Sequence, residues 1–207
     1  MASVAIEKRI TRRYGPKDNG ILMTPREYDR GKFVEGWRYE LINGVLVVSI
    51  TPLRNERDPN QELGYMLRVY QENHPQGRSL DVTLPEEEIA TGDNRRRVDR
   101  AIWAGLGRLP RRRETPTIAV EFTSAGRRNR ERDYLAKRDE YMAIGIKEYW
   151  VIDRFARTMT LFTRRGRKRV FREDQTYKTD LLPGFELPLA RLFELADRWP
   201  EEETNED

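Results

Sequence analysis

Short apolar segments separated by turn residues recur along the chain and predict a series of β-strands. The strongest signal is a hairpin over residues 39–50, in which Asn43-Gly44 supplies the two positive-φ positions of a type I′ turn. The segment 117–123 is almost entirely apolar, as is typical of a central strand buried on both faces. Further strands are predicted at 79–84, 86–90, 97–104, 148–152, 159–163 and 169–172.

Apolar residues at helical spacing predict a helix over 59–73, where Leu63, Met66, Leu67 and Tyr70 share one face. Other helices are predicted at 25–33, 129–144 and 189–196. Strands and helices do not alternate strictly along the chain. We therefore expect an α/β or α+β domain built on a mixed sheet.

The length of 207 residues is enough for one domain with a substantial core. Residues 1–20 are polar and basic and are expected to form a flexible arm, followed by a single domain over 21–198. Residues 199–207 are expected to form a disordered acidic tail, since the last seven contain five acids and no base. No apolar run approaches the roughly 20 residues of a membrane span, and residues 1–13 lack the apolar stretch of a signal peptide. We therefore expect a cytoplasmic protein.

Three acids interrupt predicted strands: Glu40, Asp99 and Glu121. An acid inside an apolar run is costly unless it is paired, protonated or bound to a metal. Carboxylates are the ligands that Mg²⁺ prefers, and a bound cation can offset charge on a phosphate and activate water. The pattern suggests the metal site of a phosphodiesterase, although a salt bridge at the end of the strand is an alternative for Asp99.

Lys137 lies four residues after Asp133, so the two residues share one face of the predicted helix. A lysine near a scissile phosphate can stabilise the transition state or orient the attacking water. The alternative is a surface ion pair that contributes a few tenths of a kcal/mol.

The absence of cysteine excludes disulfides and thiolate sites, and the single histidine, His74, argues against triads and multi-histidine metal chemistry. Lys and Arg number 39 against 35 acids, and most of the bases are arginine, whose planar guanidinium suits phosphate. Nucleic acid is therefore the leading class of partner, although an arginine-rich surface can exist without a ligand. The candidate phosphate contacts are Arg97, Arg100, Arg127, Arg128 and Arg130.

Four segments together resemble the restriction-endonuclease-like Uma-two (Uma2) family. They are Tyr39-Glu40-Leu41-Ile42-Asn43-Gly44-Val45-Leu46-Val47, Ala119-Val120-Glu121-Phe122-Thr123-Ser124, Asp133-Tyr134-Leu135-Ala136-Lys137-Arg138, and Gly145-Ile146-Lys147-Glu148-Tyr149-Trp150-Val151-Ile152-Asp153. The similarity extends over about residues 22–195. The family is assigned to the PD-(D/E)XK nuclease superfamily. The resemblance thus implies a central mixed sheet flanked by helices, with hairpin extensions, and a magnesium-type site that hydrolyses DNA.

By this resemblance, Asp99, Glu121 and Lys137 would be catalytic, and Glu40, Asp99 and Glu121 would bind Mg²⁺, with Mn²⁺ as a substitute. Lys137 stands in for the lysine usually found two residues after the second acid, a position held here by Thr123. By analogy with restriction-type nucleases, a homodimer is also expected.

The chain departs from the family at two positions. Val98 replaces the proline before the first acid, and Asn60 lies where the family often has a histidine. The primary hypothesis is a metal-dependent DNA endonuclease. Two alternatives stay open: a catalytically inactive nuclease-fold module that binds nucleic acid or a protein partner, and a structural protein whose acids only pair with its arginines.

Overall fold

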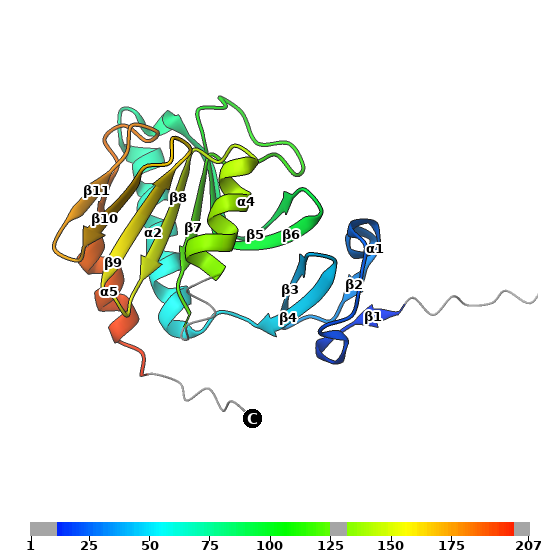
Figure 1. The fold of residues 1–207 in the computed structure, drawn as a ribbon. Helices are drawn as coiled ribbons and strands as arrows, with labels where there is room; N and C mark the ends of the chain where they lie inside the picture. Colours follow the sequence, from blue (N-terminus) through cyan, green and yellow to red (C-terminus); the bar gives the residue numbers. More distant parts are fainter. Residues whose placement is uncertain (1–11, 125–131, 201–207) are drawn as a thin grey trace, which may run out of the picture.

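The computed structural model describes residues 12–124 and 132–200, and its centre is an eight-stranded sheet (Figure 1). The strands run in the order β10-β9-β8-β7-β6-β3-β4, and β5 pairs with β6. The pair β7–β8 is parallel and the other pairs are antiparallel, so the sheet is mixed. The strands of this sheet are β3 (Trp37–Ile42), β4 (Val45–Ile50), β5 (Leu80–Thr91), β6 (Asn94–Ala104), β7 (Ile118–Phe122), β8 (Glu148–Asp153), β9 (Thr158–Thr163) and β10 (Lys168–Arg172).

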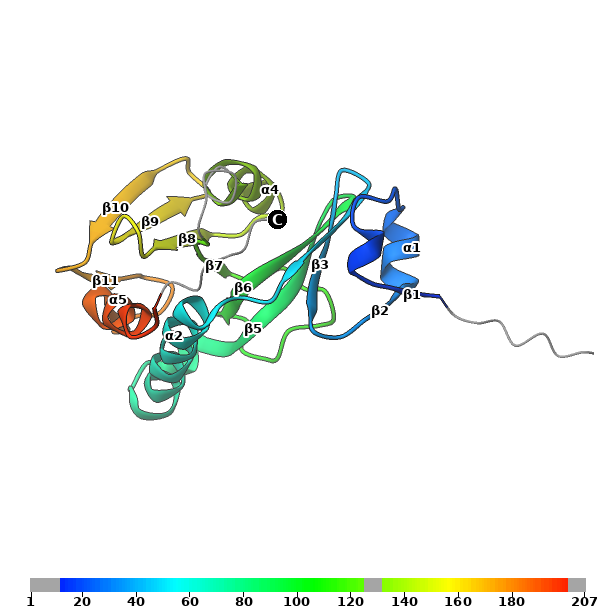
Figure 2. The same cartoon turned by 90° about the horizontal axis from the view of Figure 1, so that it is seen from below.

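Helices cover both faces of the sheet (Figures 1 and 2). On one face, α2 (Arg54–Asn73) and α5 (Leu189–Asp197) pack on a core that includes Val120 and Trp150. On the other face, α4 (Lys137–Ala143) packs on a core that includes Ala119 and Tyr149. These neighbours alternate along β7 and β8, because successive side chains of a strand point to opposite faces. The predicted mixed sheet flanked by helices is confirmed.

A smaller N-terminal unit lies beside the β3–β4 hairpin (Figure 2). It comprises β1 (Arg13–Tyr14), η1 (Pro16–Asp18), α1 (Pro25–Arg30) and β2 (Lys32–Phe33). Residues 12–20, expected as part of the loose arm, thus include a strand paired with β2 and a short helical turn. Helix α1 begins with a capping box, in which the Thr24 hydroxyl accepts a hydrogen bond from the Glu27 amide and the Glu27 carboxylate accepts one from the Thr24 amide.

The hairpin turn has the predicted backbone, with φ of 51° at Asn43 and 76° at Gly44. The two short strands predicted at 79–84 and 86–90 are instead one strand, β5, that runs through Pro85. Among the described residues β5 pairs with β6 alone, so Pro85 lies on an edge strand, where its missing N–H removes no ladder bond.

The predicted start of the second helix at Pro59 is wrong, because α2 begins at Arg54 and contains Pro59. The Glu56 carboxylate accepts the Leu53 amide at 3.3 Å and caps the helix earlier than expected. The helix predicted over 129–144 begins with a π turn, η3 (Arg132–Ala136), before α4, and residues 129–131 lie outside the described residues.

The remaining elements are a short turn, η2 (Gly77–Ser79), and the two-stranded sheet of β11 (Thr176–Lys178) and β12 (Glu186–Pro188). In residues 12–124 and 132–200, none of the helices combines the length and the apolar character that crossing a membrane requires.

Candidate active site

A buried ion pair between β7 and α4 lies at the centre of the candidate site. The Lys137 ammonium is 2.8 Å from Oε1 of Glu121, and both side chains are almost fully buried. The Tyr141 hydroxyl donates to the same oxygen at 3.2 Å. Burial, followed by the charges of Glu121 and Glu40, raises the pKa of Tyr141 well above its ordinary value, so this hydroxyl keeps its proton. Glu121 points toward α4 because it alternates with Val120, which faces α2.

Glu40 reaches the same cluster from β3. Its Oε1 accepts the Arg97 amide at 3.0 Å and lies 4.0 Å from the Lys137 ammonium. The ammonium also lies 3.3 Å from the Arg97 carbonyl oxygen. Lys137 therefore lies between acids of two different strands. The surface alternative for Lys137 is wrong, since its side chain is only 1% exposed.

Asp99 is held by groups from β3 and β7. Its Oδ2 accepts the Phe122 amide at 2.7 Å, and its Oδ1 accepts Nη2 of Arg38 at 2.8 Å. The same Nη2 donates to the Arg97 carbonyl at 2.9 Å, and Nε of Arg38 lies 3.4 Å from a Glu86 carboxylate oxygen. The structure thus brings the three predicted acids into one charged cluster that also contains two cations, Arg38 and Lys137.

The charges in this cluster act most strongly on Arg38. Its burial favours the neutral form, but the surrounding carboxylates outweigh burial and raise the pKa of the guanidinium above its ordinary value. The acids responsible are Asp99, Glu121, Glu86 and Glu40. Several carboxylates therefore gather around Arg38 in the described part of the chain, and carboxylate oxygens suit Mg²⁺ chemically.

The described residues contain no preassembled group of three acidic, histidine or cysteine side chains able to hold a metal ion. The direct contacts of Asp99 and Glu121 are instead made to Arg38 and Lys137. Charge and donor chemistry therefore fit a divalent cation, but its binding would require these two cations to shift.

Two acids of the cluster were missed by sequence reasoning. Glu56, near the start of α2, is buried, and burial together with the charge of Asp99 raises its pKa to about 7. Its position three residues after the N-cap residue Leu53 is typical of a capping glutamate, and this pattern could have identified Glu56 from the sequence. Glu86 follows Pro85 on β5 with a φ of 54°, and burial raises its pKa as well. No sequence pattern distinguishes Glu86 from the two acids that follow it.

The arginines predicted to contact phosphate differ in burial and in hydrogen-bond partners. Arg97 is half-buried and donates to the Glu86 carbonyl at 2.8 Å. Arg100 is buried beneath α2 and donates to Oδ1 and the carbonyl of Asn60, both at 2.7 Å. Asn60 in turn donates to the Asp99 carbonyl at 2.8 Å. Three further candidates lie outside the described residues, namely Arg127, Arg128 and Arg130.

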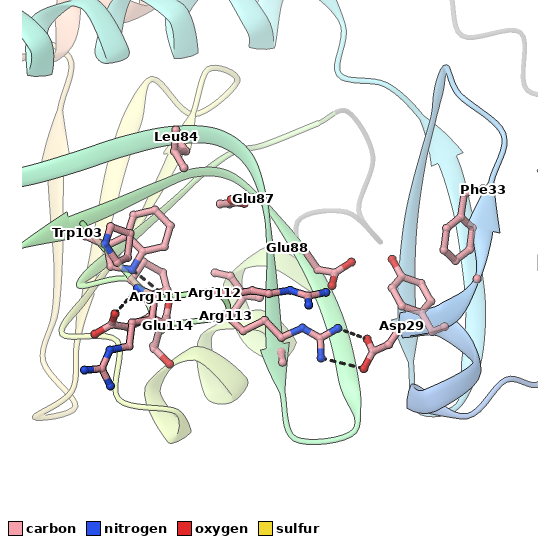
Figure 3. A pocket seen from close by; sticks show the side chains of 17 residues that line it. Asp29, Phe33, Leu84, Glu87, Glu88, Trp103, Arg111, Arg112, Arg113 and Glu114 are labelled. Carbon is pink, nitrogen blue, oxygen red and sulfur yellow. Dashed lines mark hydrogen bonds and ion pairs between the residues drawn. The ribbon is translucent and has the colours of Figure 1, made fainter. Parts of the chain in front are cut away.

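A separate cavity of about 450 Å³ lies between the N-terminal unit, β5 and the loop before β7 (Figure 3). Arg113 extends from this loop to form an ion pair with Asp29 of α1, at 2.7 Å. None of Glu40, Asp99 and Glu121 lines this cavity. The buried charges, and not the cavity, therefore mark the candidate active site.

Comparisons with known proteins identify the family and the fold. The profile of the Uma2 family, described as "Putative restriction endonuclease", matches residues 25–190. The crystal structure of a putative nuclease belonging to DUF820 from Anabaena variabilis ATCC 29413 is similar, with a TM-score of 0.70 and 17% sequence identity. The alignment covers 84% of this chain and 99% of that one, and at this identity it shows the fold alone. No curated protein matches the sequence.

Proposed function

The chain belongs to the Uma2 family, described as "Putative restriction endonuclease", and from that premise we propose that it is a metal-dependent DNA endonuclease. One observation carries the proposal: Glu40, Asp99 and Glu121, from three strands, meet around Lys137 and Arg38. Carboxylates gathered from separate strands supply the oxygen ligands that Mg²⁺ prefers.

In this proposal Glu40, Asp99 and Glu121 hold the cation, with Mg²⁺ as the resident ion and Mn²⁺ as a substitute. A divalent cation at this point would stabilise charge on the phosphate and lower the pKa of a bound water. Asp99 is oriented for this role by the Phe122 amide, and Glu40 by the Arg97 amide. Backbone donors of this kind fix the carboxylates before any ligand arrives.

Lys137 would act directly on the substrate. Its ammonium is fixed by Glu121 and by the Arg97 carbonyl, so its position depends on the packing of α4 against β7. A cation that binds Glu121 would shift the ammonium away from that acid, and a buried ammonium stabilises developing negative charge more strongly than an exposed one. We therefore assign Lys137 to the phosphate or to the attacking water.

DNA is the proposed substrate, and a homodimer the proposed assembly, because two copies would be needed to cut both strands in one encounter. The basic residues that surround the cluster would contact the phosphate backbone without reading sequence. Sedimentation of the purified protein with and without a DNA duplex measures this assembly. A monomer under both conditions would contradict it.

The first experiment is cleavage of supercoiled plasmid in Mg²⁺ or Mn²⁺ by wild type, Glu121→Gln and Glu148→Gln. Glu148 is the matched control, since it is an acid of the neighbouring strand that binds Trp150, Tyr177 and Thr179 away from the cluster. We expect metal-dependent nicking by wild type and by Glu148→Gln, and a loss of about 100-fold or more in Glu121→Gln. Plasmid that is bound but left intact would favour the binding module over the enzyme.

A further inference from the structure

Arg38 is a buried arginine whose hydrogen bonds leave part of its guanidinium group unused. Nη2 bonds Asp99 and the Arg97 carbonyl, and the side chain is 12% exposed. The Nε atom is buried and has no hydrogen-bond partner among the described residues; the nearest acid, Glu86, is 3.4 Å away. A buried N–H that is left unpaired costs about 1–3 kcal/mol, so this placement calls for an explanation.

The contact between Arg38 and Asp99 conflicts with the proposed metal site. Asp99 is a proposed metal ligand, and its Oδ1 is already engaged by Arg38. A guanidinium and a divalent cation repel each other at such short range in a buried site. A cation that binds Asp99 must therefore displace the Arg38 guanidinium from this oxygen.

The displaced guanidinium has a suitable alternative partner. Arginine presents a planar set of donors that matches phosphate oxygens, and it stays charged in almost any environment. Arg38 lies on β3, two residues before Glu40, so the two side chains share one face of the strand and a guanidinium released from Asp99 stays beside the proposed metal ligands. Its unpaired Nε–H would then gain an acceptor.

We propose that Arg38 is the phosphate-binding residue of this site and that Asp99 holds it in an inactive position until a divalent cation binds. This inference rests on the proposed function. It makes metal and phosphodiester bind cooperatively, because each ligand removes a contact that opposes the other. The coupling must be reciprocal, so a phosphodiester also tightens metal binding by the same factor.

The test is Mn²⁺ binding, followed by the electron paramagnetic resonance signal of the free ion, with and without dimethyl phosphate as an inert phosphodiester. Wild type is compared with Arg38→Met and Arg38→Lys. The control is Arg95→Met, since Arg95 is also a buried arginine paired with an aspartate, Asp29, outside the cluster. Each variant is first checked for native near-ultraviolet circular dichroism.

We expect Arg38→Met to bind Mn²⁺ about tenfold more tightly than wild type, because the competing cation is gone. Dimethyl phosphate should tighten Mn²⁺ binding in wild type and in Arg95→Met but not in Arg38→Met. Arg38→Lys should keep the weaker Mn²⁺ affinity of wild type and lose most of the coupling, since a lysine lacks the planar fork.

Unchanged or weaker Mn²⁺ binding in Arg38→Met would overturn the inference and leave the proposed function intact. Equal coupling in Arg38→Met and wild type would do the same. If wild type binds no Mn²⁺ at all, the metal-dependent function fails and the inference falls with it. Arg38→Lys keeps the test valid if Arg38→Met does not fold.

Discussion

Two neighbouring residues of β6, Asp99 and Arg100, carry buried charges with opposite kinds of partner: Asp99 has charged neighbours, and Arg100 has neutral ones. Asp99 points to β3 and β7 and joins a cluster of acids and cations. Arg100 points to α2, where its guanidinium bonds neutral groups of Asn60 and Thr83. Burial, with a smaller effect of Arg68, lowers the pKa of Arg100 to about 10, while Arg38 in the acidic cluster is shifted upward.

This difference separates a structural charge from a candidate functional one. Arg100 is held by hydrogen bonds from one helix and one strand, all to neutral groups, so it is a buried cation fixed by packing and does not belong to a group of acids that could hold a metal. The cluster around Asp99 brings several carboxylates to Arg38, whose Nε–H has no hydrogen-bond partner among the described residues. A buried network with an incompletely satisfied member is where an added cation or phosphate would gain the most.

The largest expected effect is on stability and concerns the buried ion pair of Glu121 and Lys137. Glu121→Leu leaves the Lys137 ammonium buried without its closest acid, which should lower the free energy of unfolding by about 3–5 kcal/mol. The half-buried pair Arg157–Glu173 is the control, and Glu173→Leu should cost much less, because water screens this pair. Urea denaturation measures both.

The double variant Glu121→Leu/Lys137→Met tests the cause of that loss. Removing both charges should recover much of the stability, because no uncompensated ammonium remains. If the double variant is no more stable than Glu121→Leu alone, the loss comes from packing rather than charge.

The next effect is on pH dependence and arises from Glu56. Its pKa is raised to about 7 in the folded protein, from 4.5, so the folded state favours the protonated form. The resulting stabilisation is fully present below pH about 4.5 and is lost as pH rises through about 7, a change on the order of 3 kcal/mol. Glu56→Gln should therefore be more stable than wild type at pH 8 and similar to it at pH 4.5.

Thermal unfolding of wild type and Glu56→Gln between pH 4.5 and pH 8 measures this difference. Glu87→Gln is the control, since that residue lies on β5 outside the cluster. Parallel stability curves for wild type and Glu56→Gln would show that Glu56 titrates normally in the folded protein.

The smallest expected effect is on stability and concerns the packing of Gly64 against Arg100. A Cβ at Gly64 of α2 would lie 2.6 Å from Nη2 of Arg100, which is held by Asn60 and cannot move freely. Gly64→Ala should therefore destabilise the protein by about 1 kcal/mol despite the better helix propensity of alanine.

In an Arg100→Met background the sign should reverse, because the clash is gone and the gain in helix propensity of up to about 1 kcal/mol remains. Urea denaturation of wild type, Gly64→Ala, Arg100→Met and the double variant measures this double-mutant cycle. Destabilisation by Gly64→Ala in both backgrounds would mean that a different contact limits the space at this position.

Much of the architecture could be predicted from local patterns. The Asn43-Gly44 turn, the capping box at Thr24 and the buried strand around Glu121 depend on residues close together in sequence. The predicted start of the second helix was wrong because a second local signal prevailed over the proline. Pro59 is an ordinary start signal, yet α2 begins five residues earlier, with the buried Glu56 capping its first turn.

Local patterns alone show that three acids interrupt apolar strands, and burial makes each of them need a partner. The identity of those partners depends on how the chain folds: Lys137 lies 16 residues from Glu121, and Arg38 lies 61 residues from Asp99. Alternation along a strand fixes the face on which a side chain lies. The charges that face it depend on which strands become neighbours and in what register, and that is set by packing of the whole chain.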